Sequence, residues 1–218
     1  MTTKIFNLII LDASGSMNRI KEEAIDNVNE TIQTICEAQR KHEDQHHFVT
    51  IVTFNDTVKT ICDCVSVDEV KEFDDETYQP NCFTALYDAM GFSLTALRSK
   101  VEEGDRVLVT VVTDGLENAS REYTSSAIKA LVDELKEKGW VFAYLGANHD
   151  VEAVASSISI TNVMEFKATP SGTRDMTRTM NRSRNMLYCM MSSVDFCAKS
   201  ANENFFENDD DEIGRAHV

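Results

Sequence analysis

Two short segments of the sequence combine carboxylate and hydroxyl side chains that could hold a metal ion. The first is Asp12-Ala13-Ser14-Gly15-Ser16, the second is Thr113-Asp114-Gly115, and Thr84 lies between them after a polar connection. Oxygen donors without nearby Cys or His suit Mg²⁺, Mn²⁺ or Ca²⁺ rather than zinc or copper. A divalent-cation site would form if the fold brings five side chains together: Asp12, Ser14, Ser16, Thr84 and Asp114.

The hydrophobic pattern predicts the strands that would position these residues. Apolar runs of strand length alternate with helical periods, which is typical of a mostly parallel sheet with helices on both faces. The predicted strands are Ile5–Leu11, Phe48–Phe54, Val58–Val65, Arg106–Val112, Trp140–Leu145 and Asn162–Phe166. Asn55-Asp56 predicts a tight turn, so the third strand would be an antiparallel edge strand. The predicted fold is therefore α/β, a doubly wound three-layer sandwich around a mostly parallel six-stranded sheet.

Apolar residues at three- and four-residue spacing predict the helices. The helical patterns are Met17–Ile35, Leu86–Val101, Ile128–Leu135, a short helix near Val151–Ile158, and a long final helix over Met176–Cys197. In doubly wound sheets, ligands bind beyond the carboxyl ends of the strands. Asp12 and Asp114 follow two such ends and Thr84 precedes a helix, so all of the candidate ligands are expected at one edge.

The D-x-S-x-S run of Asp12, Ser14 and Ser16, followed by Thr84 and Asp114, resembles the metal-ion-dependent adhesion site of von Willebrand factor A domains. The resemblance covers roughly residues 3–200, since the order of strands and helices also matches. It implies a Rossmann-like fold in which Ser14 and Ser16 bind the metal directly. Thr84 would bind directly when ligand is present, while Asp12 and Asp114 neutralise charge, largely through bridging waters.

This donor set also predicts what the bound metal could do. Two carboxylates only balance the charge of a divalent ion, and hydroxyls are weak neutral donors, so the metal would keep a free position for an outside carboxylate. We therefore predict a non-enzymatic module in which bound Mg²⁺ (or Mn²⁺ or Ca²⁺) coordinates an Asp or Glu of a protein partner. With no visible secretory signal, the chain looks like the intracellular, bacterial-type members, which act in complexes or signalling assemblies.

One segment departs from the family pattern. Pro80-Asn81-Cys82-Phe83 precedes Thr84 where glycines are usual, which puts the close approach of this loop in question, although Asn81 tolerates unusual backbone angles. The nearby acids lack calcium-loop spacing, so a solvated face is expected rather than a second ion site. They are Asp68, Glu69, Glu72, Asp74, Asp75 and Glu76.

Composition limits the partners. The 218 residues carry a formal charge of −16, which opposes binding to nucleic acid and to anionic membranes. No apolar run approaches the roughly 18–20 residues of a membrane span, and the six Cys are expected to be reduced thiols, so a cytoplasmic location is predicted. Residues 1–200 are expected to form one domain, and residues 201–218 an acidic, disordered tail.

Two other functions fit the sequence less well. A magnesium-dependent phosphatase or phosphotransfer enzyme would use Asp12 as nucleophile, but the general acid expected two residues later is Ser14 here. The P-loop and G-x-S-x-G motifs are also absent from the sequence. A purely structural domain, binding through its tail or last helix, would not need competent residues at all five metal positions.

The remaining polar clusters favour ordinary roles. Arg174, Arg178, Arg182 and Arg184 are expected on the solvated face of the final helix, or near the metal edge, where they could attract an acidic partner. His42, His46 and His47 are expected at a helix end and on the surface. Cys62 and Cys64 alternate within a strand, so both thiols are expected on one face.

Overall fold

Six strands form a single sheet in the order β3-β2-β1-β4-β5-β6. This computed structural model describes residues 2–193 and 195–206. The strands are β1 (Thr3–Asp12), β2 (Gln45–Phe54), β3 (Val58–Ser66), β4 (Arg106–Thr113), β5 (Trp140–Gly146) and β6 (Val163–Glu165). Every neighbouring pair is parallel except β2 and β3. The predicted mixed sheet with one antiparallel edge strand is confirmed.

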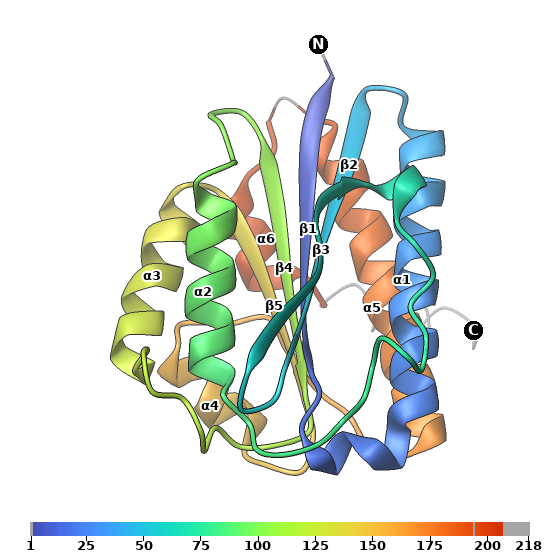
Figure 1. Ribbon diagram of the computed structural model, residues 1–218. Coiled ribbons are helices and arrows are strands. Elements are labelled where there is room, and N and C mark those ends of the chain that lie inside the picture. The colour runs from blue at the N-terminus through green and yellow to red at the C-terminus, as the bar shows by residue number, and fades with distance from the viewer. Residues whose placement is uncertain (1, 194, 207–218) are drawn as a thin grey trace, which may run out of the picture.

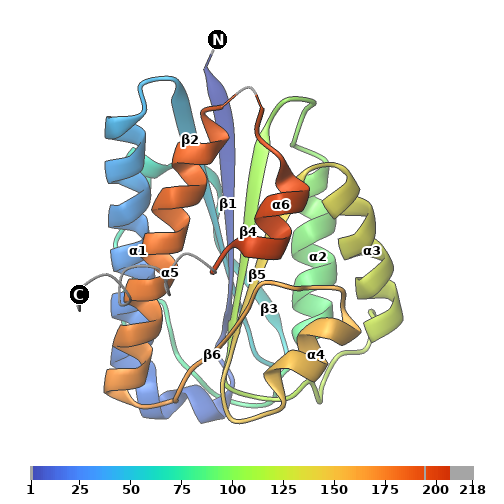
Figure 2. The same ribbon diagram turned by 180° about the vertical axis from the view of Figure 1, so that it is seen from behind.

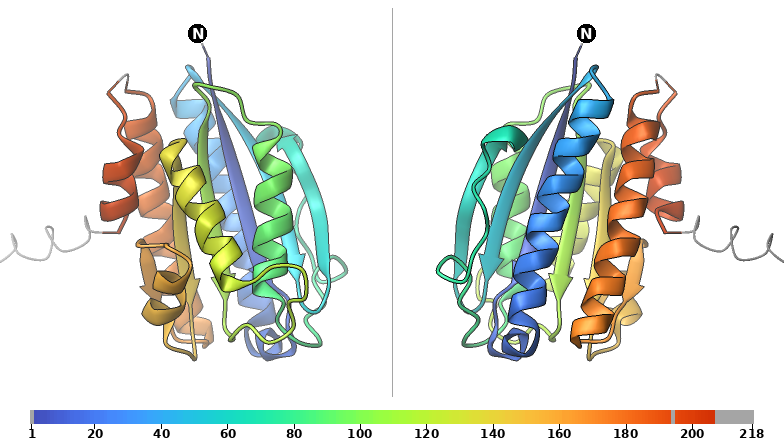
Figure 3. Two further views of the ribbon diagram at one scale, coloured as in Figure 1. Left: turned by 90° about the vertical axis from the view of Figure 1, so that its left-hand side faces the viewer. Right: turned by 90° about the vertical axis from the view of Figure 1, so that its right-hand side faces the viewer.

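Helices cover both faces of this sheet (Figures 1 and 2). One face carries α1 (Lys21–Lys41), α5 (Pro170–Met191) and α6 (Ala198–Asn204). The other carries α2 (Leu86–Arg98), α3 (Ser125–Glu137) and α4 (Val151–Ser157). Side views show the sheet between these two layers (Figure 3). Short 3₁₀ segments, η1 (Gly15–Ile20) and η2 (Val67–Glu69), follow β1 and β3.

The alternation of side chains along β1 explains why helices pack against both faces of the sheet. Ile5, Ile9 and Leu11 face the layer of α1 and α5, whereas Leu8 and Ile10 face the layer of α2 and α3. Successive strand residues point to opposite faces, so a continuous apolar run supplies two hydrophobic cores at once. The carboxyl ends of β1 and β4 then meet at one edge, at the bottom of Figure 1.

The last helical region differs from the predicted single helix. Thr169 accepts a hydrogen bond from the Gly172 amide and caps the start of α5, which ends at Met191 rather than reaching Cys197. Cys197 instead precedes α6. Arg184, expected on the solvated face, is buried, and its guanidinium donates to Thr110 Oγ1 at 3.1 Å.

The predicted disordered tail also begins too early, because residues 201–206 pack against the sheet. Asn202 accepts a hydrogen bond from the Phe142 amide and donates one to the Trp140 carbonyl. The short β6 pairs only with the end of β5, at Tyr144–Gly146. The Asn202 side chain therefore supplies hydrogen bonds to β5 backbone groups that β6 does not reach and that would otherwise lack partners at the sheet edge. The rest of the predicted tail, 207–218, lies outside the described residues.

Two further side chains are more buried or differently placed than expected. His47 is fully buried, its Nε2 lies 3.0 Å from Gln45 Oε1, and burial lowers its pKa to about 3. Cys62 contacts the core beneath α1, whereas Cys64 contacts the core beneath α2. Register shifts between β2 and β3, with Cys64 at a φ of 53°, place the two thiols on opposite faces.

Candidate metal centre

The centre is built where β1 and β4 end side by side. Leu11 pairs with Val112, so Asp12 and Thr113 are the next residues on neighbouring strands. Asp12 is fully buried, and its Oδ2 accepts a 2.6 Å hydrogen bond from Thr113 Oγ1. Its Oδ1 accepts from the Ser14 amide, also at 2.6 Å. The carboxylate is therefore fixed in place by neutral donors on two elements.

Two serine hydroxyls connect this carboxylate to the second one. Ser14 Oγ lies 3.1 Å from Ser16 Oγ. Ser16 Oγ in turn donates to Asp114 Oδ1. Asp114 is buried, as is Ser14, whereas Ser16 is exposed. Four of the five predicted ligands thus form one continuous cluster that opens to solvent at Ser16.

Thr84 completes the set from a different loop. Its amide donates to Asn118 Oδ1 at 2.9 Å, and its carbonyl accepts from the Asn118 amide at 2.9 Å. These bonds hold the Thr84 segment against the loop that follows β4. A Cβ at Gly115 would lie 3.4 Å from Thr84 Oγ1 and 3.7 Å from Ser16 Oγ, so both hydroxyls flank this glycine. The fold brings all five side chains together.

The glycine-free segment before Thr84 does approach the D-x-S-x-S run closely. The Asn81 amide donates to the Ala13 carbonyl at 2.8 Å, and the Gly15 amide donates to the Cys82 carbonyl at 3.1 Å. Cys82, not Asn81, adopts the left-handed conformation, with a φ of 61°. The approach therefore relies on a non-glycine residue in a sparsely populated region of backbone space.

The two carboxylates differ in the groups that balance their negative charge. Burial raises the pKa of Asp12 to about 6, while its hydrogen bonds to Thr113 and Ser14 act in the opposite direction. Asp114 Oδ2 instead meets Arg19 Nη2 at 3.0 Å. Two buried carboxylates thus share one basic partner among the described residues. Buried charge normally requires a counter-charge, so the cluster suits an added cation.

Three neighbours of this cluster, Arg19, Tyr78 and Thr113, are not among the five predicted ligands. Arg19 lies on η1, directly after the D-x-S-x-S run, and a basic residue so close to predicted acidic ligands was a usable signal. Tyr78 donates its hydroxyl to the Asp12 carbonyl, and Thr113 holds the Asp12 side chain. The contact of Tyr78 bridges 66 residues, and no local pattern signals it.

Two large apolar side chains are exposed beside the residues of the centre. Phe83 is 66% exposed and Leu116 is 56% exposed, and they adjoin Thr84 and Gly115 respectively. The hydrogen bonds between Thr84 and Asn118 hold their two loops together.

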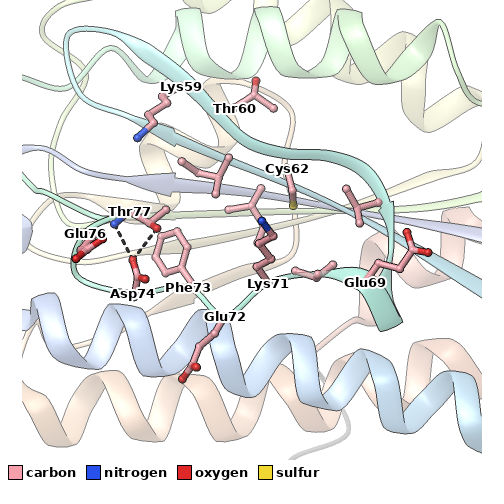
Figure 4. A pocket seen from close by; sticks show the side chains of 14 residues that line it. Lys59, Thr60, Cys62, Glu69, Lys71, Glu72, Phe73, Asp74, Glu76 and Thr77 are labelled. Carbon is pink, nitrogen blue, oxygen red and sulfur yellow. Dashed lines mark hydrogen bonds between the residues drawn. The ribbon is translucent and has the colours of Figure 1, made fainter.

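The acidic segment after β3 lines a different hollow. A pocket of about 630 Å³ lies between β3 and residues 69–77 (Figure 4). Asp74 Oδ1 accepts hydrogen bonds from the Thr77 amide and hydroxyl, which lowers the Asp74 pKa and stabilises a turn. Throughout the described part of the chain, no three His, Cys, Asp or Glu side chains group as a metal site. The five-residue centre differs in relying on hydroxyl oxygens.

The sheet order and the two helical layers define a doubly wound α/β domain. The sequence model of the von Willebrand factor type A domain matches residues 8–179, and the chain belongs to this family. Such domains commonly serve as protein-interaction modules. Among curated proteins, no sequence matches the chain significantly.

Solved structures share the fold at low sequence identity. Proximal thread matrix protein 1 of the mussel byssus is 16% identical with a TM-score of 0.59, over 84% of this chain and 46% of that one. The PilB minor pilin of Streptococcus sanguinis is 12% identical with a TM-score of 0.59, over 85% and 62%. BatB of Bacteroides thetaiotaomicron, described as a conserved hypothetical protein, is 15% identical with a TM-score of 0.54, over 84% and 98%. The chain therefore spans less than two thirds of the mussel and streptococcal proteins.

Among the described residues, no helix combines the length and the apolar content that crossing a bilayer demands.

Proposed function

We propose that this domain is a non-enzymatic protein-binding module that presents a divalent cation, Mg²⁺ first, to a carboxylate of a partner protein. The observation that carries the proposal is the convergence of Asp12, Ser14, Ser16, Thr84 and Asp114 at one edge of the sheet. An all-oxygen donor set suits Mg²⁺, Mn²⁺ or Ca²⁺. The under-compensated burial of Asp12 supports a cation beside it.

Each residue has a role in this proposal. Ser14 and Ser16 would hold the metal through their hydroxyls, and Thr84 would join them when a ligand is present. Asp12 and Asp114 would balance its charge, largely through water. The metal, when bound, supplies an electrophilic position that an outside carboxylate can fill. The exposed Phe83 and Leu116 would then contact apolar groups next to the partner's Asp or Glu.

The enzyme alternative receives less support from the same geometry. A nucleophilic Asp12 would need an oxygen open to substrate, yet both of its oxygens accept hydrogen bonds and its side chain is fully buried. Ser14 stands where a phosphatase of this kind would place its general acid, and a hydroxyl does not transfer protons near neutral pH. No turnover of phosphate esters is expected with Mg²⁺.

Manganese provides a direct test, because its inner-sphere waters can be detected. We expect the wild-type chain to bind Mn²⁺ in titration calorimetry and to raise water proton relaxation, with acetate lowering that relaxation by displacing water. D12N and S14A should abolish both signals, whereas D75N removes the same charge from an exposed acid and should leave them intact. Wild-type protein that binds neither Mn²⁺ nor Mg²⁺ at millimolar concentrations would contradict the proposal.

A partner would be sought in a lysate with three matched baits: wild type with Mg²⁺, wild type with chelator, and D12N with Mg²⁺. The proposal expects a protein retained only by the first bait. A partner retained equally by all three would show that binding does not use the metal. The partner, the cytoplasmic location and the bacterial origin stay predictions.

A further inference from the structure

Arg19 is bonded to the candidate metal centre by two donors. Its Nη2 lies 3.0 Å from Asp114 Oδ2, and its Nε donates to the Ser16 carbonyl at 3.3 Å. The other oxygen of Asp114 accepts from Ser16 Oγ. The guanidinium therefore joins η1 to the loop after β4 through two of the predicted ligand residues.

The two ends of this ion pair differ in exposure. The Asp114 side chain is 0% exposed, whereas the Arg19 side chain is 57% exposed. A buried carboxylate without a counter-charge is unfavourable, so the folded domain is more stable with a cation near Asp114. Arg19 can move into solvent without breaking core packing, since η1 exposes it. Of the two partners, Arg19 is therefore the one that can leave the ion pair.

We infer that Arg19 is an internal counter-cation that competes with the divalent metal for Asp114 and so weakens metal binding. The inference rests on the proposed function. Without metal, Arg19 supplies Asp114 with its positive charge. With metal bound, a guanidinium left in place would add a third positive charge next to two carboxylates, and Coulomb repulsion between the two cations would oppose it. Metal binding is thus coupled to breaking the pair of Arg19 and Asp114.

This coupling gives R19Q two effects of opposite sign. Without metal, R19Q should lower the melting temperature, because Asp114 loses its counter-charge. In titration calorimetry, R19Q should bind Mg²⁺ or Mn²⁺ roughly tenfold more tightly, as expected for removing one charge near a divalent ion in a water-like dielectric. R19K keeps the charge and should stay close to wild type. A residue that only supports the loop would lower both stability and affinity when replaced.

A matched control is R98Q, which removes an arginine from the far end of α2. Arg98 pairs with Glu134 and closes a 13-residue helix that begins beside the Thr84 loop. At 1.5 Å per residue it lies about 20 Å from the centre, so R98Q should not change metal affinity. A change in R98Q as large as that in R19Q would show that the effect comes from net charge alone.

A second measurement on the wild-type chain does not depend on the folding of R19Q. The Nε–H signal of Arg19 in a ¹⁵N spectrum, assigned with R19K, should shift or broaden as Mg²⁺ saturates the site. Wild-type metal binding with an unmoved Arg19 signal, or with equal or weaker affinity in R19Q, would overturn the Arg19 inference and leave the proposed function intact. Absence of metal binding in both wild type and R19Q would refute the proposed function, and the inference with it.

Discussion

Thr113 Oγ1 donates a 2.6 Å hydrogen bond to Asp12 Oδ2 and thereby links the ends of β4 and β1 beneath the candidate metal centre. The other carboxylate oxygen accepts from the Ser14 amide. Both donors are neutral, and burial raises the Asp12 pKa to about 6. The ionised Asp12 side chain therefore weakens the metal-free fold.

D12N should stabilise the metal-free protein while removing its metal binding. The folded-state pKa of Asp12, about 6, lies above its ordinary 3.8, so ionised Asp12 destabilises the fold above pH 6 by about 3 kcal/mol at most. Asparagine has the same shape and still accepts from the Ser14 amide. Urea denaturation with chelator at pH 8 should show D12N to be the more stable protein, and a less stable D12N would contradict this reading.

T113V should weaken metal binding without abolishing it. Valine matches threonine in shape but cannot donate to Asp12, so the carboxylate would lose its orientation and a hydrogen bond that lowers its pKa. Loss of such a supporting contact typically reduces metal affinity by about 10–100-fold. Calorimetry with Mn²⁺ measures the change, and T113S, which restores the hydroxyl, should recover most of the affinity. Equal affinities in T113V and wild type would show that the Ser14 amide alone positions Asp12.

The sheet and the five ligand candidates could be predicted because local patterns encode them. The apolar run of β1 and the turn at Asn55 fix strand type and the antiparallel edge, and strand ends in a doubly wound sheet share one side. The spacing of Asp12, Ser14 and Ser16, together with Asp114 after β4, then predicts the site at this edge of the sheet. Its convergence could be argued from topology without any side-chain contact.

What the sequence could not supply are contacts between distant segments. Cys82 adopts the left-handed φ, although Asn81 is the neighbour that tolerates such angles more readily, and the Cys82 carbonyl accepts from the Gly15 amide. Asn202 is polar and lies in an acidic stretch, yet its amide completes the edge of β5. Arg184 lies two residues after the exposed Arg182, yet its guanidinium reaches Thr110 in the core. In each case a contact with a distant segment overrides the local expectation.

H47Q should make the protein less sensitive to acid. His47 is buried with its pKa lowered to about 3, so it stays neutral in the folded state, whereas the unfolded chain takes up a proton near pH 6.5. Stability from this residue is therefore lost as the pH falls from 6.5 towards 3. Between pH 7 and 4.5 the wild type should lose about 2–3 kcal/mol more than H47Q in urea denaturation. Parallel stability profiles for the two proteins would rule this out.

Replacement of Arg184 should separate the effect of its charge from that of its volume. The guanidinium donates to Thr110 Oγ1 and Tyr188 Oη, its Nε has no partner, and no carboxylate within the described residues forms an ion pair with it. Since a buried charge without a counter-ion is costly, R184M, which fills similar space without charge, should equal or exceed the wild type in stability. R184A leaves a cavity between α5 and β4 and should lose about 2–4 kcal/mol in urea denaturation. If R184M lost as much as R184A, the hydrogen bonds of the guanidinium, and not its bulk, would be what secures α5 to the sheet.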